Sequence, residues 1–127
     1  MARVLFVGFD PETMDYSDPA LPPGMTSAKI EAGIDLAMEQ MAARGWTADL
    51  CLIRPNETAV PTVERQLAST NYDCVVIGAG VRLPPRHLVL FEAVVNVACR
   101  AAPAAAVAFN TIPEDSADAA ARWLQRG

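Results

Sequence analysis

The sequence predicts an α/β protein: a three-layer α/β/α sandwich around a four-stranded parallel sheet, with strands and helices alternating as (βα)4. The first observation is the unbroken apolar run Cys74–Ile77, which is typical of a strand covered on both faces. The second is the regular alternation of such strands with amphipathic segments, which indicates a parallel sheet. The third is a glycine sequence, residues 78–80, followed by a helix start, as at ligand sites of α/β proteins.

Each element is expected from its own residues. Thr26 is placed to cap the first helix and Gly45 to end it near Arg44. Thr111 and Glu114 fit a capping box for the last helix, which is expected to end near Gln125. The predicted strands are residues 3–9, 48–53, 74–77 and 104–109. The predicted helices are residues 27–44, 59–68, 85–100 and 112–125.

The chain is expected to form a single domain over residues 1–127. Its length is that of an ordinary domain, and 52% of its residues are hydrophobic, which is enough for a sizeable core. No linker and no internal repeat beyond the βα unit interrupts it. With right-handed crossovers, the predicted strand order is 2-1-3-4.

This strand order predicts where a ligand site would lie. The chain changes direction between the first and third strands, and ligands of such sheets bind at the carboxyl ends of the strands over that point. The loops that flank this point are residues 10–25, rich in proline and aspartate, and residues 78–85. We expect the two loops to meet at one concave pocket, since long ordered loops often carry function.

Arginine side chains and free backbone N–H groups at the second loop favour an anionic ligand. Arg82, Arg86 and His87 stand beside a predicted helix start. Asn110 follows the fourth strand and should lie nearby. The predicted ligand-binding residues are therefore Asp10, Gly78, Gly80, Arg82, Arg86 and Asn110.

The acidic residues of the first loop are interpreted as solvated charge. Carboxylates near a strand end can hold Mg²⁺, but the spacing of Asp10, Glu12, Asp15 and Asp18 matches no metal-binding loop, and no metal site is predicted. His87 is the single histidine and is expected to be exposed in the first turn of a helix. One histidine gives little support to a zinc site or a Ser-His-Asp triad.

Three segments resemble a group of small bacterial proteins with a flavodoxin-like or Rossmann-like fold. They are RVLFVGFDPETMDYSDPALPPGMT, LCLIRPNET and YDCVVIGAGVRLPP, which together span most of the chain. The resemblance implies an intact domain of this fold without the fifth strand, and no activity is attached to it.

The sequence lacks the motifs by which related folds bind several classes of ligand. The first strand is followed by Phe9-Asp10-Pro11 and not by the glycines of a dinucleotide site, and no Gly-Lys-Ser/Thr sequence forms a P-loop. A phosphate-accepting receiver would carry aspartate where Gly78 ends the third strand. A cobalamin-binding domain would carry a histidine in the first loop, which has none.

The helix predicted at residues 85–100 is apolar around most of its circumference. Only Glu92, Asn96 and Arg100 form a polar stripe, whereas one sheet face needs an apolar stripe of about 100°. Leu90, Val94 and Val97 would then be exposed, and pairing of two copies through this helix would cover them. A homodimer through residues 85–100 is therefore predicted. The alternative is cover by the last helix or the long loop.

The net charge, the apolar segments and the cysteine positions indicate which partners and which compartment to expect. The net charge of −5 opposes binding to nucleic acid and to anionic membranes. No apolar segment reaches the length of about 18–20 residues that a membrane span needs, and no signal-peptide pattern is seen, so the cytoplasm is expected. Cys51, Cys74 and Cys99 lie in apolar runs and are expected to be small buried residues.

The sequence thus favours a protein that binds a small molecule, anionic in this interpretation, in a crevice at the strand ends. The alternative is an oligomeric interaction module without a catalytic site. The two hypotheses place the functional surface differently. The first needs the loops 10–25 and 78–85 to line one pocket, and the second needs the helix predicted at residues 85–100 to form a subunit contact.

Overall fold

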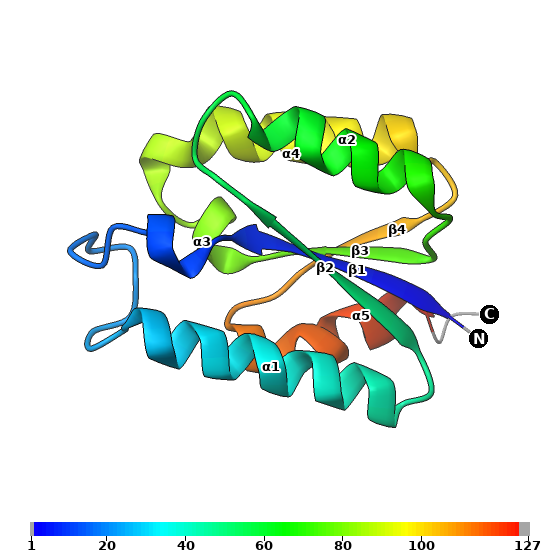
Figure 1. Cartoon of the computed structure of the whole chain (residues 1–127), viewed down its shortest axis with the longest axis horizontal. Helices are drawn as coiled ribbons and strands as arrows, with labels where there is room; N and C mark the ends of the chain where they lie inside the picture. The colour runs from blue at the N-terminus through cyan, green and yellow to red at the C-terminus, as the bar shows by residue number, and fades with distance from the viewer. Residues whose placement is uncertain (1, 125–127) are drawn as a thin grey trace.

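The computed structural model describes residues 2–124 and shows a four-stranded parallel sheet between two layers of helices (Figure 1). The strand order is β2-β1-β3-β4, which confirms the predicted fold class and topology. The last strand starts two residues later than expected, because residues 102–105 form a turn closed by the Ala105 N–H on the Ala102 carbonyl. The strands are β1 (Arg3–Phe9), β2 (Thr47–Ile53), β3 (Cys74–Ile77) and β4 (Ala106–Phe109).

The strand register brings all four carboxyl ends to one edge of the sheet. Phe9 pairs with Ile53, and Ile77 pairs with both Val7 and Phe109. The loops after β1, β3 and β4 consequently leave the sheet side by side, at the left of Figure 1.

Two helices cover each face of the sheet. One face carries α1 (Ser27–Ala43) and α5 (Ser116–Leu124), and the other carries α2 (Ala59–Ser69) and α4 (Leu88–Ala101) (Figure 1). Thr26 caps α1 as predicted, its hydroxyl accepting the Lys29 N–H at 3.2 Å, and Gly45 follows its end with a φ of 83°. The predicted end of the last helix at Gln125 lies outside the described residues. No helix among residues 2–124 is long and apolar enough to cross a membrane.

The segment after β3 differs from the prediction. Helix α3 (Ala79–Arg82) starts directly after the strand, and a 3-10 turn, η2 (Pro85–His87), separates it from α4. The break falls at Pro84, whose ψ of 122° is extended. A residue before proline disfavours the helical region, and Pro85 lacks the N–H that a continuous helix would need.

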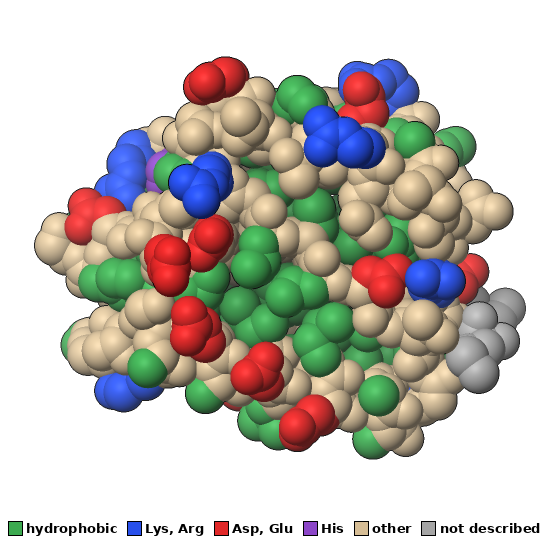
Figure 2. Space-filling view, in the orientation of Figure 1, with side chains coloured by type: hydrophobic (Ala, Val, Ile, Leu, Met, Phe, Trp, Pro, Cys, Tyr) green, Lys and Arg blue, Asp and Glu red, His purple; other side chains and the backbone are tan. Residues whose placement is uncertain are grey.

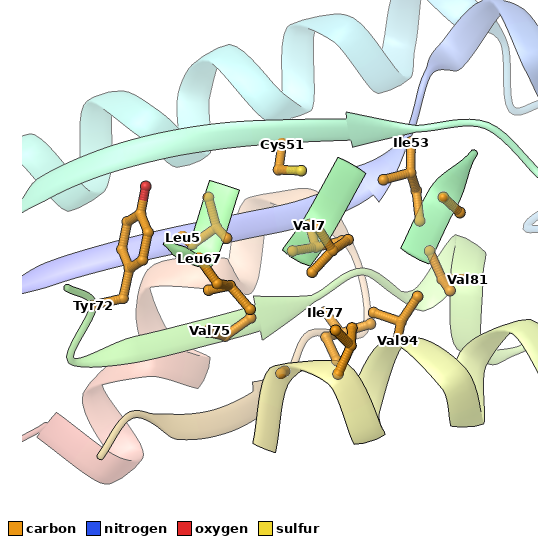
Figure 3. Packing of buried hydrophobic residues seen from close by; sticks show 14 of the residues in the cluster. Leu5, Val7, Cys51, Ile53, Leu67, Tyr72, Val75, Ile77, Val81 and Val94 are labelled. Carbon is orange, nitrogen blue, oxygen red and sulfur yellow. The ribbon is translucent and has the colours of Figure 1, made fainter. Parts of the chain in front are cut away.

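The apolar circumference of α4 is covered within the chain. Val94 and Val97 are 0% and 1% exposed, so the expectation that they lie in water is wrong. Figure 3 shows Val94 pointing from α4 toward Ile77 and Val81. Leu90 is half-buried against the same cluster, which includes residues of α2. The neighbouring helix α2, and not the last helix or the long loop, supplies the cover. A homodimer through α4 stays a prediction, with Leu88 and Val89 as its exposed apolar residues.

The cysteines divide into two buried thiols and one exposed thiol. Cys51 and Cys74 lie in the core, whereas Cys99 is exposed on α4, contrary to the expectation. Burial raises the pKa of the Cys51 thiol, and burial together with Asp73 raises the pKa of Cys74 to about 12.

We therefore expect one thiol to react in the folded protein. Titration with Ellman's reagent at pH 8 should modify Cys99 at once, and the two buried thiols only after denaturant is added, because the reacting species is an accessible thiolate. Cys99→Ser should abolish the fast phase. A fast phase of more than one thiol equivalent would contradict the packing of β2 or β3.

Candidate functional site

A crevice lies where the carboxyl edge of the sheet meets the loops after β1, β3 and β4. The loops 10–25 and 78–85 both line it, so they meet at one concavity. Its empty space is about 570 Å³ when the open mouth is included, and its inner part is narrow. It is lined by Phe6, Gly8, Phe9, Met14, Leu21, Pro22, Met25, Ile30, Ile34, Gly78, Ala79, Gly80, Leu83, Asn110, Thr111, Ile112 and Pro113.

Three glycines leave the room for this crevice. A Cβ at Gly80 would lie 3.1 Å from Met14 Cε, and one at Gly8 would lie 2.8 Å from Phe6 Cε1. A Cβ at Gly78 would touch the Val7 carbonyl at 3.4 Å. None of the three has a positive φ, since within residues 2–124 only Gly24 and Gly45 do. Their function is therefore to keep side chains out, and not to permit a left-handed turn.

The backbone N–H groups of the glycine sequence are largely engaged within the protein. Gly78 donates to the Val7 carbonyl at 2.8 Å, which extends the pairing of β1 and β3. Ala79 donates to Asn110 Oδ1 at 2.7 Å. The expectation that these groups are free to bind an anion is wrong for both residues.

Asn110 connects three segments beneath the crevice. It is 2% exposed, and its Nδ2 donates to Ser116 Oγ at 3.0 Å. The Ser116 hydroxyl in turn donates to the Pro113 carbonyl at 2.7 Å. The amide thus ties the end of β4 to the starts of α3 and α5, and both its polar atoms are occupied.

The start of α5 is capped differently from the prediction. Asp115, and not Glu114, accepts the Thr111 N–H at 3.0 Å and the Thr111 hydroxyl. A 3-10 turn, η3 (Pro113–Asp115), precedes the helix, which moves the capping carboxylate one residue along the chain. Thr111 is therefore held at the crevice wall by its own helix start.

Arg86 joins the two loops. Its Nη1 lies 2.5 Å from Asp18 Oδ2 and 3.7 Å from Asp15 Oδ2. Asp18 is 8% exposed, and its Oδ1 accepts the Ala20 N–H at 2.9 Å. The interpretation of the first loop as solvated charge is thus wrong for Asp18, because a buried carboxylate needs a charged or hydrogen-bonding partner. The Arg86 guanidinium is therefore already paired with two carboxylates of the protein itself.

His87 packs against the end of β1. Its ring meets the Phe9 ring edge-on, with 4.9 Å between centroids, and it lines a second, more polar depression beside Arg86, Asp18 and Thr13. Its pKa is lowered, first by burial and then by the positive charge of Arg86.

We expect the His87 ring to titrate below pH 6.5 in an NMR pH series. A depressed pKa means that the unfolded chain binds the proton more readily, so His87 contributes stability above pH 6.5 that is lost as the pH falls. Arg86→Gln should raise the His87 pKa, since it removes a nearby positive charge. A midpoint at or above 6.5 in the native protein would show that the ring is solvated instead.

Two predicted residues lie outside the crevice. Arg82 points toward β4, where its Nη2 donates to the Asn110 carbonyl at 3.0 Å and its Cζ lies 6.0 Å from the Phe109 ring centroid. Asp10 caps η1 (Pro11–Thr13), its Oδ1 accepting the Glu12 N–H at 3.0 Å, and it lines a separate depression beside β2. Of the predicted set, Gly78, Gly80 and Asn110 line the crevice, and Arg86 lies at the neighbouring depression with Gly80.

The residues that sequence reasoning missed are the apolar ones. Met14, Leu21 and Met25 from the first loop, with Leu83 and Ile112 opposite, form most of the wall. Their signal was present in the sequence as apolar residues at intervals in an otherwise polar loop. Thr111 and Asn110 are the polar side chains of the wall, and no three His, Cys, Asp or Glu residues within 2–124 are grouped to hold a metal.

Comparisons with protein-family models, curated proteins and solved structures found no match. The fold and its layers are therefore established by the structure alone, and the resemblance to small bacterial proteins stays a prediction.

Proposed function

We propose that this chain binds a small, mainly apolar molecule in the crevice at the carboxyl edge of its sheet. The observation that carries the proposal is the apolar wall built over three glycines that keep the space open. Ligand sites are commonly apolar concavities with a few placed polar groups, and sheets of this order hold them at this edge. The Thr111 hydroxyl supplies such a group here, because its oxygen can accept a hydrogen bond while its proton is donated to Asp115.

The contacts favour this ligand over the anion suggested by the sequence. Arg86 is paired with Asp18, Arg82 points toward β4, and the Ala79 N–H is bonded to Asn110. An anion entering from the Arg86 side would have to displace a buried carboxylate, which costs free energy. An apolar molecule needs no such displacement and gains from leaving water.

The test compares apolar and anionic probes on isotope-labelled protein. Indole, cyclohexanol and p-xylene should shift the amide signals of Gly78, Gly80 and Thr111 in a saturable way, whereas inorganic phosphate and AMP should not. Phosphate or AMP shifting these amides, with no effect of the apolar probes, would overturn the proposal.

A pocket-filling variant makes the test specific. Gly80→Leu should lower the affinity for the apolar probe at least tenfold, because its side chain enters the space in front of Met14. Ala68→Leu, on an exposed position of α2, is the matched control and should leave the affinity unchanged. Equal binding by both variants would place the probe elsewhere. The alternative function, an interaction module, is favoured by a different surface, the outer edge of β2.

A further inference from the structure

The outer edge of β2 is long and open. It is a terminal strand of the sheet, and its seven residues pair with β1 on one side. The Thr47 N–H bonds to the Ala2 carbonyl, and the Ile53 carbonyl accepts from Asp10. Residues of a parallel strand turn their backbone groups to alternate sides. Ala48, Leu50 and Leu52 therefore turn their N–H and C=O groups outward, where no hydrogen bond within residues 2–124 reaches them.

The other edge of the sheet is protected. β4 has four residues, and the same alternation turns the Phe109 carbonyl outward, where Arg122 Nη2 donates to it at 2.9 Å. Short length and charged side chains are ways in which proteins block strand addition at an edge. Strand β2 has neither along Leu50 and Leu52.

An apolar groove with an acidic border runs beside this open edge. Leu50 and Leu52 are 38% and 39% exposed and, with Ile34 of α1, form its floor. Figure 2 looks onto this face and shows a hydrophobic patch bordered by carboxylates. Four acidic residues line the groove, and no ion pair within residues 2–124 reaches them: Asp10, Glu12, Glu31 and Asp35.

We propose that this edge binds an extended, cationic segment of another protein, which adds to the sheet as a strand next to β2. The outward groups of Ala48, Leu50 and Leu52 supply the backbone hydrogen bonds, and every second residue of the segment faces the groove. These groove-facing residues alternate between apolar side chains, which pack on Leu50 and Leu52, and basic side chains. The lysine or arginine side chains of the segment reach Glu31 and Asp35, whose charge is uncompensated. A second copy of this chain, with a net charge of −5, would bring further negative charge to an acidic surface.

The test uses end-blocked octapeptides made of Val-Thr-Lys-Thr or Val-Thr-Glu-Thr repeats, in which valine and the charged residue share one face of the strand. The lysine peptide should shift the amides of residues 48–53 and weaken with added salt, and the glutamate peptide should not bind. Shifts confined to other elements, or equal binding of the two peptides, would overturn the proposal.

Variants of the protein separate the contribution of charge to peptide affinity from the contribution of backbone hydrogen bonds. Glu31→Lys with Asp35→Lys should weaken the lysine peptide at least tenfold, whereas Glu92→Lys on the opposite layer should change the affinity less than twofold. Leu52→Pro removes an outward N–H at an edge position and should weaken binding tenfold, unlike Leu52→Val.

If Leu52→Pro fails to fold, N-methylated peptides test the backbone hydrogen bonds instead. Of two lysine peptides, N-methylated on the threonines or on the valines and lysines, one should lose binding to the unaltered protein, because one set of amides faces β2. Equal binding of both would overturn strand addition. Sedimentation of the free protein as a dimer at 100 μM that Leu50→Lys dissociates would also overturn the proposal, by assigning this edge to a second copy.

Discussion

Replacing Val94 with glutamate should unfold the protein. The side chain is fully buried between α4 and the sheet, packed near Ile77 and Val81 (Figure 3). A carboxylate there loses its hydration without gaining a partner, at a cost of about 4 kcal/mol or more. That is comparable with the total stability of a domain, about 5–15 kcal/mol. Circular dichroism and urea titration should show loss of the cooperative transition or a large fall in its midpoint.

The matched control is Val89→Glu on the same helix. Val89 is 77% exposed, so the same substitution should change the stability by less than about 0.5 kcal/mol. If Val94→Glu remained folded and only converted a dimer into monomers, α4 would be a subunit interface and its packing against α2 would be wrong.

Replacing Asn110 with alanine should cause the second largest loss of stability. The substitution removes the acceptor of the Ala79 N–H and the partner of Ser116, both buried. Each unsatisfied buried group costs about 1–3 kcal/mol, so we expect about 2–4 kcal/mol in urea unfolding. The amide of Ala79 should also lose its protection from hydrogen exchange, since Asn110 holds α3 against the end of β4.

Asn96→Ala is the control for this prediction. Asn96 is exposed on α4, where its side chain bonds to the Glu92 carbonyl, and alanine is the better helix former. Its stability should therefore stay within about 0.5 kcal/mol of the native value or rise slightly. A loss at Asn110 no greater than at Asn96 would mean that water replaces the amide at this junction.

The position of the crevice was predictable, but the direction of its side chains was not. The loops 10–25 and 78–85 meet because parallel strands release their chains at one edge, which follows from strand order alone. Arg82 and Asp10, by contrast, bind backbone groups beside the crevice. A side chain in a loop turns to the nearest unsatisfied donor or acceptor. For Arg82 that group is the carbonyl of Asn110, distant in the sequence, and for Asp10 it is the N–H of Glu12, two residues along the chain.

Periodicity likewise could not assign the cover of α4. The apolar excess of this helix was correctly found in the sequence, and it implied a second covering surface. Two surfaces were conceivable within the chain and one between chains, and the structure shows a third, helix α2. Burial depends on which elements become neighbours, and a helical wheel carries no information on neighbours.

The sequence by itself determined the four βα units, the parallel sheet and the edge at which a ligand site would form. These follow from local apolar patterns and from the handedness of crossovers, which act over short stretches of chain. Only the tertiary structure decided that Asp18 pairs with Arg86 and that Asn110 is a buried junction. It also decided that β4 is capped while β2 is open. These contacts join residues far apart in the chain, so they depend on the packed arrangement and leave no local pattern.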